Sequence, residues 1–282
     1  MQIFNTKSSL QHYLQHIRED RKTITLVPTM GALHEGHLSL IRQAGQSGDI
    51  TVCSIFVNPT QFNDPKDLEK YPRPLGNDIA LLESTSCDVL FLPSVEEMYP
   101  DPDENWHLDL GNLETIWEGE HRPGHFQGVT QIVYKLFNLV KPDFACFGQK
   151  DFQQVMVVQK MIDIKQLLIK LIICPIIRDK HGLALSSRNM RLSAEGKEKA
   201  LVLSKSLQCA KANFKSKTID ELTRLGKDII QAEEDVTLEY FAICETRTLQ
   251  QTKELHSDKE YVALVVAWVE DVRLIDNMLL NE

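Results

Sequence analysis

Continuous apolar runs alternate with segments of helical periodicity along the first part of the chain. The apolar runs cover residues 23–27, 50–57, 89–92, 144–147 and 167–174, and the apolar spacing predicts helices over 75–84, 129–140 and 152–162. Runs that are apolar at every position are typical of strands buried on both faces, as in a parallel sheet covered by helices. The pattern therefore predicts an α/β protein whose N-terminal domain, residues 1–175, contains a Rossmann-like parallel sheet.

The pattern changes after Pro175. Two polar helices are predicted at about 194–212 and 219–232, and strand-like runs follow at 238–244, 261–269 and 272–275. Only Glu270 and Asp271 separate the last two runs, which favours a hairpin. We therefore expect a smaller α+β domain over residues 176–282.

Composition and charge exclude several classes of protein. The formal net charge of −9 over 282 residues disfavours a general binder of nucleic acid or anionic membranes. No apolar run approaches about 18 residues and the N-terminus is polar, so we expect neither a transmembrane helix nor a signal peptide. The six cysteines form no C-x-x-C pair, which predicts buried thiols in a reducing cytoplasm.

The segment from Val27 to His37 combines the features of a phosphate-binding turn. It follows a buried strand, contains Gly31 and Gly36, and places His34 and His37 at the start of a predicted helix. Backbone N–H groups at a helix N-terminus attract phosphate, and glycine allows its close approach. The imidazoles can donate hydrogen bonds to phosphoryl oxygens. The alternatives are a polar helix cap or a zinc pair, although the pattern H-E-x-x-H and a third ligand are missing.

Further polar segments follow two other predicted strands. Residues 58–62 contain the uncharged amides Asn58 and Gln61, which can orient hydroxyl or carboxylate groups. Residues 148–154 contain Lys150, which suits a phosphate, and Asp151, which can cap a helix or hold Mg²⁺ through water. Read alone, each segment is equally compatible with a polar loop or a capped helix.

Two more segments could complete a site. Residues 182–189 carry two serines and Arg188, which can close over a triphosphate or belong to a domain linker. Residues 118–126 form a polar, glycine-containing loop with Arg122 and His125. Because the carboxyl ends of parallel strands meet at one edge, we expect a nucleotide there, in a cleft between the two domains.

These segments together resemble the pantoate–β-alanine ligase family. The resemblance covers essentially the whole chain in the same order and extends to Arg273–Asn277. The H-x-G-H element alone marks a broad superfamily of nucleotidyltransferases and some aminoacyl-tRNA synthetases, whereas its combination with residues 58–62, 148–151 and 186–189 is far more specific. Gln149 stands where some members have Glu, and Thr60 stands where others have Met.

The resemblance implies an ATP-dependent ligase of pantothenate biosynthesis. In that reaction the carboxylate of (R)-pantoate attacks the α-phosphorus of Mg-ATP, which gives pantoyl adenylate and pyrophosphate. The amine of β-alanine then attacks the acyl carbon and releases AMP. The resemblance thus implies ATP as co-substrate with Mg²⁺, no metal held by the protein alone, no nucleic-acid or membrane partner, and a cytoplasmic homodimer.

The resemblance also assigns residues. Catalytic roles fall on His34, His37, Lys150 and Arg188. Of these, His37 matches a residue labelled a proton donor in the family, although we expect it chiefly to stabilise transition-state charge. ATP binding falls on Met30, Gly31, Ala32, Leu33, His34, Glu35, Gly36, His37, Gly148, Gln149, Lys150, Asp151, Ile177, Leu185, Ser186, Ser187 and Arg188. Pantoate binding falls on Gln61 and Gln154, and Gln61 is also expected to meet β-alanine.

Two other functions are weighed against the ligase. Another nucleotidyltransferase of the same superfamily would share the opening motif but has no evident need for both Gln61 and Gln154. A non-catalytic nucleotide-binding protein is disfavoured because His34, His37, Lys150 and Arg188 are all present. The negative net charge and the lack of a recognisable anticodon-binding region disfavour a tRNA synthetase.

Overall fold

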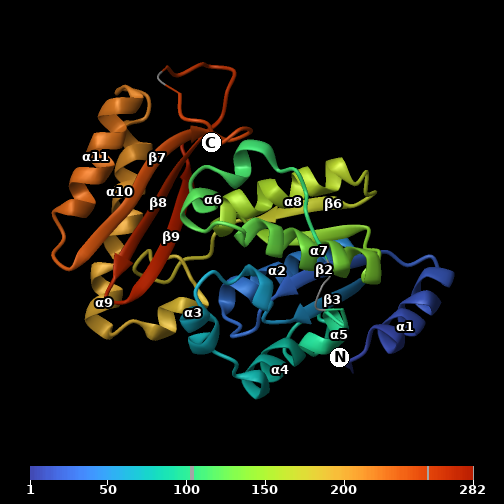
Figure 1. The fold of residues 1–282 in the computed structure, drawn as a ribbon. Helices are drawn as coiled ribbons and strands as arrows, with labels where there is room; N and C mark the ends of the chain where they lie inside the picture. The colour runs from blue at the N-terminus through green and yellow to red at the C-terminus, as the bar shows by residue number, and fades with distance from the viewer. Residues whose placement is uncertain (102–104, 253, 282) are drawn as a thin grey trace. The chain divides into compact units, whose positions relative to one another are not determined.

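The computed structural model describes residues 1–101, 105–252 and 254–281. Contacts between residues divide the chain into two compact units (Figure 1). The first unit holds Met1–Gly148 and Gln153–Pro175, and the second holds Gln149–Phe152 together with the chain from Ile176 onward. The functional division, with an ATP- and pantoate-binding domain over 1–175 and a lid domain over 176–282, stays a prediction.

A parallel sheet forms the framework of the first unit. Within the described residues it has six strands in the order β1-β4-β3-β2-β5-β6, and every neighbouring pair is parallel. The strands are β1 (Gln2–Phe4), β2 (Ile24–Thr29), β3 (Ile50–Ile55), β4 (Val89–Phe91), β5 (Phe144–Gly148) and β6 (Lys170–Cys174). β2 and β3 are buried at nearly every position, which explains why apolar and small hydroxyl residues make up their sequences.

Helices bury their apolar stripes against this sheet. α2 contributes Leu40, Ile41 and Ala44 to a core with Val27 of β2 and Cys53 of β3, and α7 packs on β2 and on α1. The helices are α1 (Lys7–Glu19), α2 (Glu35–Ser47), α3 (Pro65–Lys70), α4 (Leu75–Glu83), α5 (Val95–Met98), α6 (Glu118–His121), α7 (His125–Val140) and α8 (Phe152–Ile164). Short 3₁₀ helices η1 (Pro59–Gln61) and η2 (Gly111–Glu114) lie in the loops.

The carboxyl ends of β2, β3 and β5 are neighbours, because β2 lies between the other two strands. The chain order along the sheet reverses at β2, and α/β sheets bind ligands at such a switch point. The turn after β2, the loop after β3 and Gly148 at the end of β5 therefore share one edge of the sheet.

The second unit is an antiparallel sheet covered by helices (Figure 1). Its described strands β7 (Val236–Glu245), β8 (Tyr261–Val269) and β9 (Val272–Leu279) lie in chain order. Leu207, Leu222, Phe241 and Val265 lie in its hydrophobic core. Its other elements are η3 (Gln149–Asp151), η4 (Ser187–Arg191), α9 (Ala194–Lys199), α10 (Leu201–Asn213) and α11 (Ile219–Gln231).

The predicted fold class is confirmed, and so is the hairpin, since β8 and β9 pair from Val269 and Val272 outward. The predicted helix over 194–212 is instead two helices that meet at Ala200, and α7 begins at His125 rather than near residue 129. Five of the cysteines are buried, and Cys209 is partly buried. In the described part of the chain, no helix has the length and apolar character needed to cross a membrane.

Candidate active site

The turn after β2 has a left-handed backbone that the protein itself stabilises. Gly31 has a φ of 81° and Ala32 a φ of 50°, which turns successive N–H groups toward the interior. The carboxylate of Asp78, from α4, accepts the N–H groups of Ala32 at 2.8 Å and Leu33 at 2.7 Å. Asp78 is only 1% exposed, so these two charge-assisted hydrogen bonds form away from water.

These bonds decide which backbone donors of the segment already have a partner. The N–H groups of Ala32 and Leu33, which precede α2, bind Asp78, whereas attraction of phosphate by the N-terminus of α2 stays a prediction. The N–H of Gly31 donates to the hydroxyl of Thr29 at 3.2 Å. The sheet-edge turn therefore offers side chains, and not these backbone donors, to a ligand.

The two histidines of the turn fix one another at the start of α2. His34 is the N-cap, and its Nδ1 accepts the N–H of Gly36 at 3.2 Å. The Nδ1 of His37 accepts the N–H of His34 at 3.3 Å, and the ring centroids lie 4.1 Å apart. A ring nitrogen that accepts a backbone N–H carries no hydrogen, so both neutral rings hold their hydrogen on Nε2. Each imidazole can therefore act as a hydrogen-bond donor through Nε2.

A buried pair of amides lies after β3. Asn58 is 1% exposed, and its Nδ2 donates to the carbonyl of Gly128 at 3.0 Å and to Oε1 of Gln61 at 3.2 Å. Its Oδ1 accepts the hydroxyls of Tyr99 at 2.7 Å and Thr60 at 3.1 Å. Since the carbonyl of Gly128 can only accept, the orientation of the Asn58 amide is fixed. That orientation in turn directs Oε1 of Gln61 toward Asn58 and Nε2 away from it.

His125 and Arg122 hold the backbone of the same loop. Nδ1 of the buried His125 lies 2.7 Å from the carbonyl oxygen of Gln61, which can only accept, and Nε2 lies 3.1 Å from Nη1 of Arg122, which can only donate. His125 is therefore neutral with its hydrogen on Nδ1. Arg122 also lies 3.9 Å from the carboxylate of Glu118. These contacts fix η1, which carries Gln61.

One contact joins two of the predicted binding groups. Nε2 of Gln61, predicted to bind pantoate, lies 3.1 Å from the sulfur of Met30, predicted to bind ATP. Sulfur is a weak acceptor, so the amide remains able to make a stronger hydrogen bond to a ligand. The structure thus places these two residues side by side at the edge formed by β2 and β3.

The glutamines at the start of α8 differ in their contacts. Gln153 is buried, and its amide accepts the N–H of Glu118 at 3.0 Å and donates to the carbonyls of Leu113 and Ile116 at 2.8 and 2.9 Å. Gln153 therefore anchors the loop before α7. Gln154 is half-buried, and its role toward pantoate stays a prediction.

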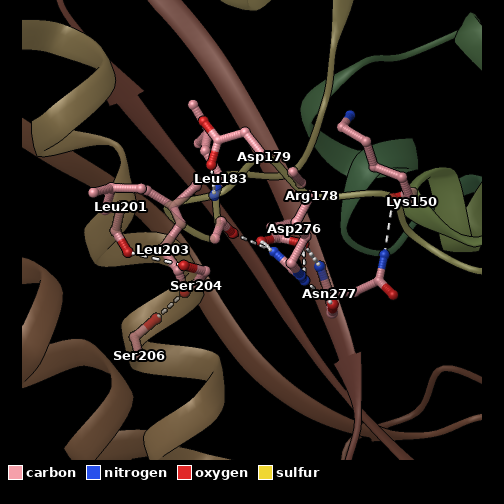
Figure 2. A network of polar contacts seen from close by, with 12 residues as sticks. Lys150, Arg178, Asp179, Leu183, Leu201, Leu203, Ser204, Ser206, Asp276 and Asn277 are labelled. Atoms are coloured by element: carbon pink, nitrogen blue, oxygen red, sulfur yellow. Dashed lines mark hydrogen bonds and ion pairs between the residues drawn. The ribbon is translucent and has the colours of Figure 1, made fainter. Parts of the chain in front are cut away.

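The second unit brings together other predicted ATP-binding residues. The N–H of Leu185 donates to the carbonyl of Ile177 at 2.9 Å, beside a bridge between Arg178 and Ala184. Ser186 then caps η4, which carries Ser187 and Arg188. η3, with Gln149, Lys150 and Asp151, is attached to β9 by Asn277 (Figure 2).

The structure adds residues that the sequence reasoning missed. Asp78 lies on the buried face of α4 together with Leu82, so a carboxylate on an otherwise apolar helix stripe was an available signal. Tyr99 contacts Asn58 from 41 residues away, and its segment carries no comparable signal. Among the described residues, no cluster of three or more histidine, cysteine or acidic side chains could hold a metal ion.

Comparison with known proteins gives a consistent family assignment. The family described as Pantoate-beta-alanine ligase matches residues 2–279. The chain is 46% identical to the pantothenate synthetase of Porphyromonas gingivalis over 99% of each chain, and 45% identical to that of Bacteroides fragilis over the whole of both.

Solved structures agree with this assignment. The pantothenate synthetase of Thermus thermophilus matches with a TM-score of 0.94 and 37% identity over the full length of both chains. The pantoate-beta-alanine ligase of Francisella tularensis, complexed with beta-gamma ATP and beta-alanine, matches with a TM-score of 0.83 and 34% identity, over 100% of this chain and 98% of its own.

Proposed function

The chain belongs to the pantoate–β-alanine ligase family, and on this premise we propose that it condenses (R)-pantoate with β-alanine at the cost of ATP. The pantoate carboxylate attacks the α-phosphorus, and the bond to pyrophosphate breaks. The β-alanine amine then attacks the acyl carbon of pantoyl adenylate, loses a proton and displaces AMP. The Francisella tularensis relative is complexed with beta-gamma ATP and beta-alanine, and we propose that this chain likewise binds ATP and β-alanine.

The contact between Gln61 and Met30 is the observation that carries this proposal. A carboxylate can attack the α-phosphorus only if the acid and the nucleotide are held within bonding reach. Nε2 of Gln61 lies 3.1 Å from the sulfur of Met30, so the residue proposed for the acid adjoins the residue proposed for the nucleotide. A passive ATP-binding protein has no need for this buried amide beside the nucleotide.

A neutral amide suits the attacking group. Gln61 can orient a carboxylate through an N–H without a full positive charge, which would stabilise the carboxylate and slow its attack. Asn58 and His125 keep Gln61 in place through hydrogen bonds, and Tyr99 in turn donates to Asn58. We propose that Gln61 also meets β-alanine and that Gln154 completes the pantoate site.

We assign phosphate stabilisation to the histidines and to residues of the second unit. His34 and His37 present Nε2–H donors, because their Nδ1 atoms accept backbone N–H groups. Such donors stabilise the charge that develops on phosphoryl oxygens. Lys150, Ser186, Ser187 and Arg188 are proposed to bind the phosphates.

Magnesium enters this scheme with its substrate as Mg-ATP. Mg²⁺ keeps several waters and binds mainly phosphate oxygens with one or two carboxylates. The exposed carboxylate of Asp151 is a suitable water-mediated partner. We further propose that the protein acts in the cytoplasm as a homodimer, as the resemblance implies.

Exchange of labelled pyrophosphate into ATP tests this function. With Mg²⁺ and pantoate present and β-alanine absent, we expect exchange that depends on pantoate, because adenylate formation is reversible. Addition of β-alanine should then release free AMP, whereas a nucleotidyltransferase would leave the nucleotide on its product. ATP binding without any pantoate-dependent exchange would refute the proposal.

A further inference from the structure

The end of β9 carries two buried polar residues that the proposed reaction has not yet used. Asp276 is 4% exposed and Asn277 is 2% exposed. Both belong to the second unit, as do Lys150 and Arg178. Figure 2 shows that the side chains of Asp276 and Asn277 meet the chain at Lys150 and at Arg178.

Asn277 binds the carbonyl groups of the two peptide units that flank the Cα of Lys150. Its Nδ2 donates to the carbonyl of Gln149 at 3.0 Å and to the carbonyl of Lys150 at 2.8 Å. Nε2 of Gln149 lies 3.4 Å from Oδ1 of Asn277. Both hydrogens of the Asn277 amide are therefore used to hold η3.

The ammonium group of Lys150 points away from this attachment (Figure 2). Lys150 is half-buried, and across the residues that the structure describes its ammonium makes no hydrogen bond or ion pair. A lysine loses much side-chain entropy when it is held. Fixing its backbone in advance leaves this side-chain cost unchanged but removes the backbone part of the ordering cost from substrate binding.

Asp276 holds a second predicted ATP-binding segment to the same strand end. Its carboxylate accepts Nη1 of Arg178 at 2.6 Å and Nη2 at 2.9 Å, as well as the N–H of Asn277 at 2.8 Å. Arg178 in turn donates to the carbonyl of Gly182 at 3.1 Å. Burial raises the pKa of Asp276, and the hydrogen bonds from Arg178 oppose that shift. The pair stabilises the turn before Leu185 and Ser186.

We propose that Asn277 is a positioning residue for Lys150, which it fixes through the backbone so that the ammonium meets the phosphates of ATP. This inference rests on the proposed function. The role suits an amide, because its NH₂ group supplies two donors to two carbonyls from one atom without placing a charge in this buried position. An aspartate here would place acceptors against acceptors.

A double-mutant cycle in the pyrophosphate exchange assay tests the inference. We expect Asn277→Ala to slow pantoate-dependent exchange on the order of 10- to 100-fold, because a displaced catalytic group loses rate steeply. In a Lys150→Ala background the same change should cost less than about twofold, since coupled residues are not additive. The reaction of supplied pantoyl adenylate with β-alanine should keep its rate in Asn277→Ala.

Asn281 provides the matched control. It lies just after β9 and, like Asn277, holds backbone, since its Nδ2 donates to the carbonyl of Lys259 and its Oδ1 accepts the N–H of Tyr261 at 2.8 Å. Asn281→Ala should leave exchange unchanged. If Asn277→Ala does not fold, Asn277→Ser, which keeps one donor, replaces it and should give a smaller loss that also disappears without Lys150.

Two outcomes would overturn the inference alone. One is normal pantoate-dependent exchange by the Asn277→Ala variant in an assay in which the wild-type protein also exchanges. The other is a loss that adds fully to that of Lys150→Ala and affects both half-reactions equally, as a general defect of folding would. Absence of exchange in the wild-type protein would instead overturn the proposed function, and this inference with it.

Discussion

Asp78→Asn is the substitution that most directly tests how the β2 turn is built. The carboxylate accepts two backbone N–H groups at 2.8 and 2.7 Å while 1% exposed. Asparagine keeps one acceptor oxygen but turns an NH₂ group toward the second donor. One hydrogen bond is therefore lost, and one buried N–H is left unpaired.

The expected cost follows from these contacts. Leaving a buried donor unpaired costs about 1–3 kcal/mol, and a hydrogen bond to a charged group contributes about 1.5–3 kcal/mol. We therefore expect Asp78→Asn to lower the free energy of unfolding of the first unit by about 2–3 kcal/mol. Domains are stable by roughly 5–15 kcal/mol, so the variant should remain folded.

Activity should fall as well, because the turn carries both histidines. A shift of the turn moves Nε2 of His34 and His37, and such displacement costs on the order of 10- to 100-fold in rate. Urea unfolding and pyrophosphate exchange, measured on the same samples, separate the two effects.

Asp88→Asn is the matched control for this experiment. The exposed Asp88 accepts the N–H of Thr51 at 2.8 Å, near the amino end of β3. The control should lose less stability and keep full exchange. If Asp78→Asn is as stable and as active as this control, the two hydrogen bonds do not hold the turn. If it loses stability alone, the turn does not position the histidines.

Three further predictions follow from local geometry. A Cβ on Gly128 would lie 2.3 Å from a backbone oxygen of η1, so Gly128→Ala should cost about 1–3 kcal/mol and raise the KM for pantoate. The control Gly76→Ala meets no atom within 4 Å and should be neutral or stabilising by up to about 1 kcal/mol in urea unfolding. His37→Asn keeps an acceptor near the position of Nδ1 but loses the Nε2 donor, so it should retain stability and lose exchange. The reverse is expected of His37→Gln, which should lose stability and retain exchange. Hydrogen bonds from Thr218 lower the pKa of Glu221, so its stabilisation is present above the ordinary pKa of about 4.3 and disappears as the pH falls through the lowered value. Glu221→Ala should therefore lose less stability than the wild-type protein between pH 7 and about pH 3.5, which urea midpoints at both pH values would show.

Helices, strands and turns could be predicted from the sequence where their own residues show which faces are buried or where the chain turns. β2 and β3 are mainly apolar because both faces are buried, and Glu270 turns the β8–β9 hairpin with a φ of 52°. α1 was not predicted but could have been, since its buried residues Leu10, Leu14 and Ile17 recur at helical spacing. The junction at Ala200 could not have been, because the residues on both sides of it favour a helix.

Contacts between distant segments could not be predicted in this way. Asp78 lies 46 residues from Ala32, and Asn277 lies 127 residues from Lys150. Nothing near either residue in the sequence indicates its partner. Only the parallel order of the strands and the pairing of β9 with β8 bring these groups together. The candidate site segments could be proposed from their motifs, but the residues that hold them in place could not.

The glycine of the β2 turn has a backbone requirement that its motif alone does not indicate. The sequence suggests that Gly31 makes room for phosphate, which stays a prediction, and its φ of 81° shows that the backbone conformation itself favours glycine there. That conformation directs the next two N–H groups to Asp78, which removes them from any ligand. We expect the imidazoles of this turn to contribute to phosphate recognition, and the Nδ1 acceptors of His34 and His37 leave Nε2 as the donor. The turn therefore acts as a rigid support for two imidazoles, and changes to Asp78 should affect the reaction through them.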